Sequence, residues 1–261
     1  MSDRSTRDVP AFHAQLMGEK RHNHALVIPV LNEGARIGNQ LARLAAASPP
    51  VDIVIADGGS SDGSLTEEIL REKGVRALLI KTGRGKLSAQ LRMAYAWCLD
   101  EGYAGIVTMD GNDKDGVEAV AAIVAALEDG ADYVQGSRYL VGGEAINTPL
   151  ERTVANRYIH APLLSLGAGR RFTDTTNGFR GYSARYLEDP RVQPFRNVFQ
   201  TYELLFYLTV RASQVGLDVR DVPVSRAYPD DGTVPTKIGG WASKLDMLGQ
   251  TLAAARGKFA P

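Results

Sequence analysis

From residue 25 to residue 135 the chain alternates short β-rich apolar runs with helical stretches, and no other feature constrains the fold as much. The apolar runs are residues 25–30, 51–56, 75–80, 105–109 and 131–135. The helical stretches are residues 35–47, 86–100 and 116–128, with a further helix opening at a Ser64/Glu67 capping box. Continuous Val, Ile and Leu content in strands separated by helices indicates parallel strands buried on both faces. The sequence therefore predicts an α/β fold, with a mostly parallel central sheet flanked by helices.

The pattern divides the chain into three parts. Residues 1–23 read as a loose N-terminal arm, and residues 24–238 as one domain with halves at about 24–135 and 136–238. In the second half we expect a mobile loop at 141–149, helices at 151–167 and 200–214, a turn-rich segment at 170–182, a strand at 219–224 and a loop at 226–237. Residues 239–261 predict a C-terminal amphipathic helix, because Trp241, Leu245, Leu248 and Leu252 have helical spacing. Packing on the domain or a partner subunit is favoured for this stripe, and docking on a bilayer is the alternative.

Composition excludes several classes of protein. Thirty Lys and Arg against 30 Asp and Glu give no excess of basic charge for wholesale binding of nucleic acid. The single cysteine, Cys98, excludes an internal disulfide and a cysteine-based zinc site. The longest apolar run, residues 119–127, is far shorter than the roughly 18–20 residues of a membrane-spanning helix. With no secretory signal in the polar first twenty residues, we expect a cytoplasmic location.

Two familiar motifs are present only in part. Gly59-x-Ser61-x-Gly63 matches a hydrolase nucleophile elbow, but the one histidine that follows, His160, lies inside a predicted helix. The run from Gly83 to Lys86 lacks the upstream glycine and the Ser or Thr of a P-loop. A hydrolase that uses Ser61 is therefore a remote alternative.

Polar side chains follow three of the predicted strands, where ligands bind in sheets of this type. After the second strand, Asp57 can accept hydrogen bonds from the N–H groups of a nucleobase, and Glu33 can accept them from ribose hydroxyls. Taken alone, this turn is explained as well by Asp and Ser residues that build the turn and cap the next helix.

The acidic cluster at residues 110–115 favours a ligand site. Crowded carboxylates repel one another unless a cation compensates them, and Mg²⁺ or Mn²⁺ commonly bridges protein oxygens to a diphosphate. We expect Asp110 to face the ion and Asp115 to cap the next helix. Ser137, Arg138, Arg170, Arg171 and residues 173–180 supply basic and polar groups for a second phosphate, although scattered surface arginines explain them equally well.

Five motifs occur in order along the chain: residues 29–33 (PVLNE), 56–64 (ADGGSSDGS), 109–112 (MDGN), 136–139 (GSRY) and 175–180 (TTNGFR). Together they resemble family 2 glycosyltransferases of the GT-A fold, a Rossmann-like architecture, and in particular the group of dolichyl-phosphate mannose synthases and polyprenyl-phosphate sugar transferases. The resemblance runs from about residue 25 to residue 237 and includes residues 202–205 and 222–224.

The resemblance implies a role for each matching residue. The nucleotide pocket, with its diphosphate end, would be formed by Pro29, Asn32, Glu33, Asp57, Lys86 and Asp110. Asp110, with Asn112, takes the place of the metal-binding Asp-x-Asp motif. The acceptor phosphate and donor sugar would be faced by Ser137, Arg138, Asn177 and Arg180. Catalytic roles fall to Asp110, Arg138 and Arg180, with Asp174 and Glu203 as candidate bases for an alcohol acceptor.

Three residues depart from the family pattern. Gly58 stands where many relatives have a second Asp, and Asn112 stands at the second Asp of Asp-x-Asp. An amide oxygen can ligate a metal but carries no charge. Lys114 stands where a third polar ligand is expected and can neutralise the diphosphate instead.

The function implied is an inverting transfer of a sugar from a GDP- or UDP-linked donor to a polyprenyl phosphate, with Mg²⁺ or Mn²⁺ as cofactor. A transferase with a soluble or saccharide acceptor, a nucleotidyltransferase, and a nucleotide-binding module without catalysis are the alternatives. Peripheral contact with the inner face of the membrane and homo-oligomerisation are left open.

Overall fold

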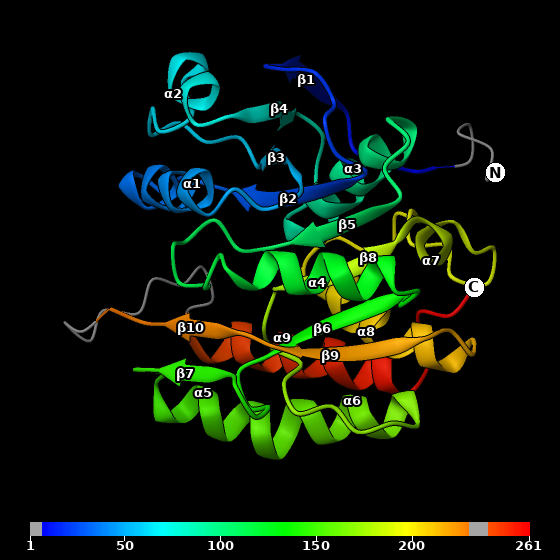
Figure 1. Ribbon diagram of the computed structural model, residues 1–261. Coiled ribbons are helices and arrows are strands. Elements are labelled where there is room, and N and C mark those ends of the chain that lie inside the picture. Colours follow the sequence, from blue (N-terminus) through cyan, green and yellow to red (C-terminus); the bar gives the residue numbers. More distant parts are fainter. Residues whose placement is uncertain (1–6, 230–239) are drawn as a thin grey trace.

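The computed structural model describes residues 7–229 and 240–261, and its centre is an eight-stranded sheet within that part of the chain (Figure 1). The strands lie in the order β1-β4-β3-β2-β5-β8-β6-β9. Their bounds are β1 Phe12–Leu16, β2 His24–Val30, β3 Asp52–Asp57, β4 Val75–Lys81, β5 Gly105–Thr108, β6 Tyr133–Ser137, β8 Arg180–Ser183 and β9 Val219–Pro223. The predicted parallel sheet is confirmed for β2, β3, β4 and β5, and β6 pairs in parallel with β9. Two antiparallel strands, β1 and β8, complete the sheet.

Helices cover both faces of this sheet (Figure 1). Their bounds are α1 Ala35–Ala47, α2 Glu67–Glu72, α3 Leu87–Asp100, α4 Ala119–Glu128, α5 Leu150–Ala155, the π-helical turn η2 Asn156–His160, α6 Ala161–Ala168, α7 Ala184–Glu188, α8 Glu203–Gln214 and α9 Gly240–Ala255. Alternate residues of β2 belong to different cores: Ala25 and Val27 pack beneath α3, whereas Leu26 and Ile28 pack beneath α1 and α4. Strands with two buried faces explain the unbroken apolar runs of the sequence.

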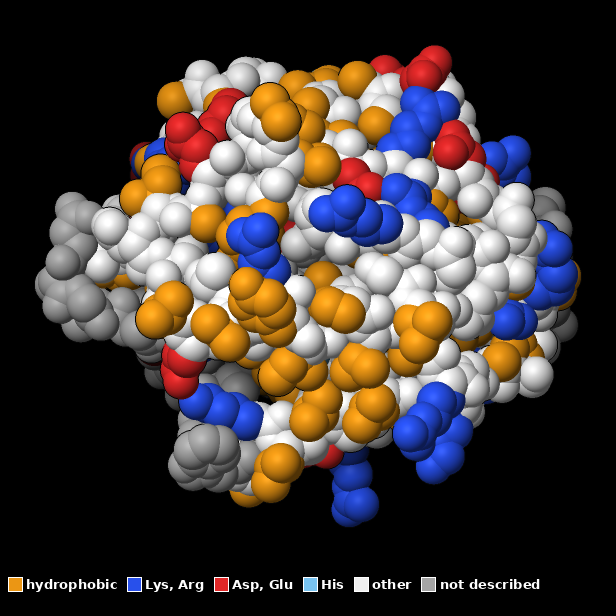
Figure 2. All heavy atoms as spheres, turned by 90° about the horizontal axis from the view of Figure 1, so that it is seen from below, with side chains coloured by type: hydrophobic (Ala, Val, Ile, Leu, Met, Phe, Trp, Pro, Cys, Tyr) orange, Lys and Arg blue, Asp and Glu red, His pale blue; other side chains and the backbone are white. Residues whose placement is uncertain are grey.

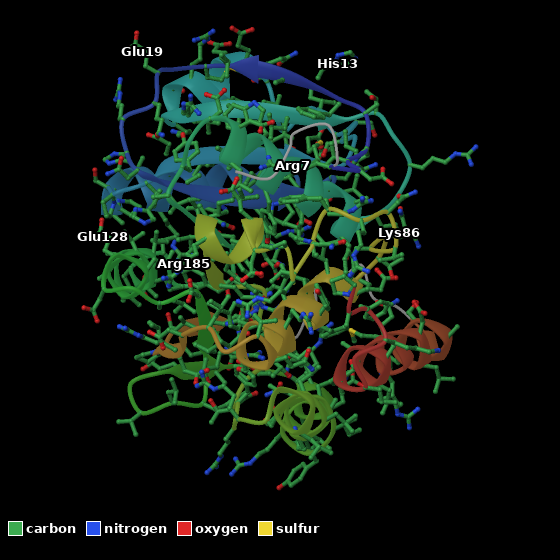
Figure 3. The ribbon with its side chains drawn as sticks, turned by 90° about the vertical axis from the view of Figure 1, so that its right-hand side faces the viewer. Arg7, His13, Glu19, Lys86, Glu128 and Arg185 are labelled. Atoms are coloured by element: carbon green, nitrogen blue, oxygen red, sulfur yellow. The ribbon has the colours of Figure 1, made fainter. Side chains whose placement is uncertain are left out.

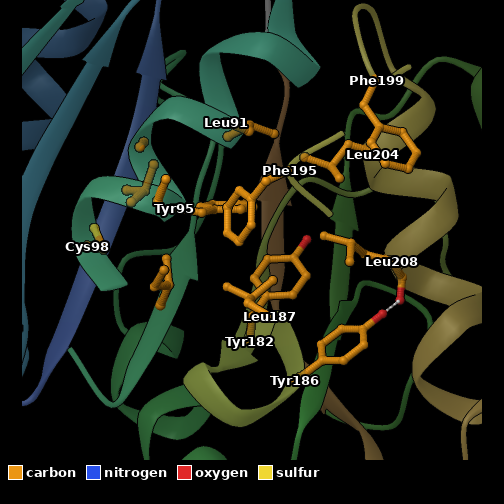
Figure 4. Packing of buried hydrophobic residues seen from close by; sticks show 14 of the residues in the cluster. Leu91, Tyr95, Cys98, Tyr182, Tyr186, Leu187, Phe195, Phe199, Leu204 and Leu208 are labelled. Carbon is orange, nitrogen blue, oxygen red and sulfur yellow. Dashed lines mark hydrogen bonds between the residues drawn. The ribbon is translucent and has the colours of Figure 1, made fainter. Parts of the chain in front are cut away.

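The larger core is aromatic (Figure 4). Tyr95 of α3 and Tyr182 of β8 lie with their ring centroids 5.3 Å apart, and Tyr186 donates a hydrogen bond to the carbonyl of Leu208 on α8 at 2.6 Å. Cys98 is buried in the same cluster, and burial raises the pKa of its thiol. This cluster packs α8 against the sheet, and α9 packs on α8.

The structure differs from the sequence prediction before the first half, in the predicted arm, and within that half, at the start of α2. Within the predicted loose arm, β1 extends the sheet, with Phe12 opposite Lys81 in antiparallel pairing. The predicted capping box is also wrong. Thr66 caps α2 by accepting from the N–H of Ile69, because the Ser64 hydroxyl is bonded instead to Asp62.

The second half is more ordered than predicted. The expected mobile loop at 141–149 contains β7 (Glu144–Ile146), which pairs in parallel with β10 (Ser225–Ala227). The turn-rich segment at 170–182 ends in β8. The predicted helix at 151–167 is interrupted by η2, and α9 packs against α6 and α8. The expected loop at 226–237 lies outside the described residues from residue 230 onward. None of the described helices is both long enough and apolar enough to span a membrane.

Candidate functional site

The loops that follow β2 and β3 are hydrogen-bonded into one unit. The N–H of Asn32 donates to Ser60 Oγ at 3.0 Å, and the N–H of Ser61 donates to Asn32 Oδ1 at 2.8 Å. The N–H of Gly34 donates to Asp62 Oδ2 at 2.8 Å. Asn32 holds a φ of 50°, a conformation that asparagine adopts more readily than most residues. These bonds make the two polar clusters of the sequence a single rigid cradle.

Asp57 lies inside this cradle, at the end of β3. Its carboxylate accepts a hydrogen bond from the N–H of Ser60 at 2.8 Å, which leaves other lone pairs to face a cavity of about 300 Å³. Leu65, Leu78 and Ile80 form the apolar wall of that cavity. An apolar wall opposite a carboxylate is a suitable environment for a flat heterocycle that carries N–H donors.

Gln90 of α3 braces the strand ends beside Asp57, although no sequence motif marks this residue. Its amide donates to the carbonyls of Val30, at 3.0 Å, and of Ala56. A side chain at Gly58 would place its Cβ 3.3 Å from the Gln90 amide oxygen. The glycine that departs from the family pattern therefore makes room for this brace.

The other residues of the predicted nucleotide pocket lie along the same edge. Pro29 is half-buried on β2, and the Glu33 carboxylate pairs with Arg36 at 2.9 Å. Lys86 is exposed at the start of α3, and Figure 3 shows it on the side of the molecule opposite Glu128, the last residue of α4.

Asp110 lies at the carboxyl end of β5, and β2 lies between β5 and β3 in the sheet. Its Oδ2 accepts from Arg226 at 2.9 Å, and a Cβ added at Gly178 would lie 2.6 Å from its Oδ1. A Cβ at Gly111 would lie 3.0 Å from the carbonyl of Pro29 on β2. Gly178 thus lets the backbone approach this carboxylate, and Gly111 lets the turn after β5 pack against β2. Burial opposes ionisation of Asp110, but the charges of Arg226 and Lys114 outweigh it and lower its pKa.

Asp115 does not cap a helix, contrary to the prediction. Both of its oxygens accept from Arg226, at 2.6 and 2.7 Å, and the two residues also form a β-bridge. Burial and the charge of Asp110 raise the pKa of Asp115, against the effect of Arg226. For Arg226, burial is outweighed by the two carboxylates, so its pKa is raised. Sequence reasoning missed Arg226, whose only signal was its position after a short strand.

Lys114 completes this charged group. Its ammonium lies 4.7 Å from the ring centroid of Tyr228, and Arg152 donates to the Tyr228 hydroxyl at 3.3 Å. Burial, with the repulsion of Arg226, lowers the pKa of Lys114 to about 8. The Lys114 side chain is therefore a cation that titrates close to physiological pH.

Asn112, two residues after Asp110, carries an oxygen of the kind that ligates a metal. Its Oδ1 is buried and has no hydrogen-bond partner among the described residues. A buried acceptor without a partner is rare in proteins, and hard cations prefer oxygen ligands. Within residues 7–229 and 240–261, no group of three or more His, Cys, Asp or Glu side chains could hold a metal. Any divalent ion here would need further oxygens from a ligand.

Arg138 and Asp174 form a buried ion pair. Arg138 Nε and Nη2 donate to Oδ2 and Oδ1 of Asp174 at 2.7 and 3.0 Å, and the two side chains are 5% and 0% exposed. Nη2 also donates to Thr176 at 3.0 Å, and Ser137 is hydrogen-bonded to Thr173. Both oxygens of Asp174 are therefore engaged in hydrogen bonds. This arrangement suits a residue that supports the segment at 173–177 better than it suits a general base.

Arg180 points into the protein interior, away from the face expected of it. It is 1% exposed, and its guanidinium donates to the carbonyls of Asn177, Leu205 and Thr175 at 2.6–2.9 Å. Asn177 accepts from the N–H of Phe179, but its own amide nitrogen is buried without a partner among the described residues. Of this segment, Asn177 therefore retains a free donor and Arg180 does not.

Glu203, the second candidate base, is also engaged. Its carboxylate accepts from the N–H groups of Gln200 and Thr201 and from the Thr201 hydroxyl at 2.6–3.0 Å. These bonds hold the turn that leads into α8, and Glu203 is the first residue of that helix, where a carboxylate is favoured by the helix dipole.

The hydrolase alternative is not supported by the geometry. His160 Nδ1 is hydrogen-bonded to Thr251 of α9 at 3.0 Å, and its ring stacks on Phe206. Ser61 lies in the exposed cradle loop. The histidine that a triad needs is therefore committed to packing between α8 and α9.

The central sheet is mostly parallel, the loops after β2 and β3 form a polar cradle, and an acidic turn follows β5. These features define the class: the fold is that of the GT-A glycosyltransferases. It matches glucosyl-3-phosphoglycerate synthase from Mycobacterium tuberculosis, solved with Mn²⁺, UDP and phosphoglyceric acid, with a TM-score of 0.62 at 17% identity over 90% of this chain and 77% of that chain.

The chain belongs to glycosyl transferase family 2, whose model matches residues 25–189. Polyprenol monophosphomannose synthase of Mycolicibacterium smegmatis is 30% identical over 207 residues, which are 77% of this chain and 76% of that protein. Undecaprenyl-phosphate mannosyltransferase of Micrococcus luteus is 26% identical over 201 residues, which are 76% of this chain and 81% of that protein. The predicted family and enzyme class are confirmed.

Proposed function

We propose that this glycosyltransferase moves a sugar, with inversion, from a GDP- or UDP-linked donor to the phosphate of a polyprenyl phosphate. The names of its relatives from Mycolicibacterium smegmatis and Micrococcus luteus support this acceptor. The observation that carries the proposal is the position of Asp110, which accepts from Arg226 at 2.9 Å and stands two residues before Asn112, whose buried Oδ1 has no hydrogen-bond partner among the described residues. This arrangement lies on the sheet edge that also carries the Asp57 cavity.

In this proposal Asp57 accepts hydrogen bonds from the base, and the cradle loops enclose the nucleoside. Asp110 and Asn112 would hold a Mg²⁺ or Mn²⁺ ion, which stabilises negative charge on the departing diphosphate when bound. The exposed Lys86, at the start of α3, approaches the same diphosphate from the side of the helix N-terminus.

The state of the two candidate bases favours a phosphate acceptor. Asp174 and Glu203 are each engaged by several donors and are poorly placed to accept a proton from an alcohol. A phosphate acceptor is already ionised near neutral pH and needs no base. Lys114, Arg226 and the amide of Asn177, which has no partner among the described residues, supply the donors that an incoming phosphate requires.

The test is a transfer assay with purified protein, Mn²⁺, radiolabelled nucleotide sugars and a polyprenyl phosphate in detergent. We expect label in the organic phase with the wild type, and a loss of at least about a hundredfold with Asp110→Asn, which keeps the size of the side chain. Glu68→Ala, at an exposed carboxylate on α2, is the control and should keep full activity. Label on a soluble saccharide, with none in the lipid, would contradict the proposed acceptor.

A further inference from the structure

We propose that Gln40 and Arg43 of α1 are positioning residues, which hold the acidic turn at residues 110–115 in the conformation that serves the site. This inference rests on the proposed function, in which Asp110 and Asn112 of that turn hold a divalent cation. Neither α1 residue belongs to the predicted site, and no sequence motif marks them. The two residues together are called the α1 clamp.

The acidic turn reverses the direction of the chain at Asp113. Asp110 and Asp115 lie five residues apart, yet both carboxylates accept from the same guanidinium, that of Arg226. The chain between them must therefore fold back on itself, and Asp113 has a φ of 59°. A left-handed backbone is costly for residues other than glycine, so this conformation needs support from its surroundings.

The α1 clamp supplies that support. The N–H of Asp113 donates to Gln40 Oε1 at 2.9 Å, and Arg43 Nη1 donates to Asp113 Oδ1 at 2.9 Å. Arg43 Nη2 also donates to the carbonyl of Asp115 at 3.1 Å. Both the backbone and the side chain of Asp113 are therefore held from α1.

The burial of Gln40 supports a specific role for its oxygen. The residue is 0% exposed, and its Nε2 has no hydrogen-bond partner among the described residues. A buried amide donor without a partner costs free energy, and an aliphatic side chain of similar size would avoid that cost. An aliphatic side chain could not accept the hydrogen bond from Asp113, which is the contact that Gln40 provides.

The same helix also connects the acidic turn with the cradle. α1 begins at Ala35, directly after the cradle residues Asn32 and Gly34, and the N–H of Gly34 donates to Asp62 Oδ2 at 2.8 Å. One helix therefore joins the loop proposed to enclose the nucleoside to the turn that carries Asp110.

The contacts argue against a second metal motif in this turn. Residues 113–115 read Asp-Lys-Asp, which is itself an Asp-x-Asp sequence. Asp113 pairs with Arg43, and both oxygens of Asp115 accept from Arg226, so each carboxylate already pairs with a guanidinium. Asp113 therefore acts through its backbone conformation, and its carboxylate is not required as a metal ligand.

The test is isothermal titration of GDP and UDP, with and without Mn²⁺, on variants of Asp113. Asp113→Ala should lower the increment in affinity that Mn²⁺ provides at least about fivefold, because a turn that relaxes in the free protein has to be restored on binding. Asp113→Gly should stay within about threefold of the wild type, because glycine adopts a positive φ readily. Equal losses in the two variants would show that the carboxylate itself is required, and would overturn the inference.

Arg43→Gln tests the clamp from the side of α1. This variant should lower the same increment, and adding Asp113→Gly should restore it, since glycine needs no support at that φ. A double variant no better than Arg43→Gln would overturn the inference, as would equal losses with and without Mn²⁺. Arg191→Gln is the matched control: like Arg43, Arg191 is partly exposed and pairs with an aspartate, Asp189, and its variant should bind like the wild type.

The clamp variants leave the far end of the molecule unchanged. α1 lies in the upper half of Figure 1, whereas α5 and α6 lie at the bottom, and Figure 2 shows the hydrophobic side chains gathered on the face of α5 and α6. A change in nucleotide binding therefore reports on the acidic turn and not on that face.

Hydrogen exchange separates failure of this inference from failure of the proposed function. Without nucleotide or Mn²⁺, the peptide that covers residues 110–116 should exchange at least about fivefold faster in Arg43→Gln than in the wild type. Unchanged exchange overturns the inference, whatever the titration shows. If exchange is faster but the wild type gains no affinity from Mn²⁺, the metal role in the proposed function is overturned and the support of the turn by α1 stands.

Discussion

Replacing Asp174 should destabilise the protein instead of disabling a catalytic base. In Asp174→Asn the Arg138 guanidinium keeps its position at 5% exposure but loses the charge that compensates it. Breaking a buried ion pair from one side costs about 3–5 kcal/mol. At roughly 2–4 °C per kcal/mol for a domain of similar size, the melting temperature should fall by about 6–20 °C.

A double-mutant cycle isolates the pair. Arg138→Gln leaves the opposite charge uncompensated, and the double variant should lose much less stability than the two single losses added together. Differential scanning calorimetry measures each variant, and Glu67→Gln, in an exposed pair with Arg71, should change stability by less than about 1 kcal/mol. Transfer is measured well below each melting temperature. Unchanged stability with a loss of turnover of about a hundredfold or more would refute this reasoning and restore Asp174 as a base.

Three further predictions follow from single contacts. Gly178→Ala should weaken Mn²⁺-dependent nucleotide binding at least about tenfold, because the added Cβ would lie 2.6 Å from Asp110 Oδ1. Gly249→Ala is the control: its added Cβ has no neighbouring atom within 4 Å, and this variant should bind normally in the same titration. Lys114 is charged below its pKa of about 8, so kcat/KM should fall as pH rises through 8. Lys114→Gln should have a lower kcat/KM that depends less on pH, and an unchanged dependence on pH would argue against an ionic role. Burial lowers the pKa of His160, so protonation of this residue favours the unfolded chain. Thermal stability should therefore fall as pH drops below 6.5, and it should fall less steeply in His160→Gln. Equal slopes in the two proteins would contradict a role of His160 in this pH dependence.

The sheet and the position of the site could be predicted from sequence because both depend on local patterns. Unbroken Val, Ile and Leu runs follow from strands with two buried faces, and polar turns after parallel strands share one edge. Asn32, Asp57 and Asp110 come directly after such strands, and the structure places them on that edge.

The residues that sequence reasoning missed or misplaced depend on tertiary contacts. Arg226 reaches Asp110 from 116 residues away along the chain, and no local pattern marks such a pairing. Arg180 and Glu203 lie in polar segments that look like surface, yet Arg180 bonds interior carbonyls and Glu203 holds the turn before α8. A charged residue that supports a loop and one that contacts a ligand have the same sequence signature.

The central claim is that the Asp57 cavity and Asp110 form one site for a nucleoside diphosphate. Isothermal titration of GDP and UDP, with and without Mn²⁺, tests it most directly. For the nucleotide that the wild type binds, Asp57→Asn should weaken affinity about tenfold to a hundredfold in both conditions, since a charged acceptor is lost. Asp110→Asn should remove only the increment that Mn²⁺ provides. Nucleotide binding that neither substitution alters would contradict the account.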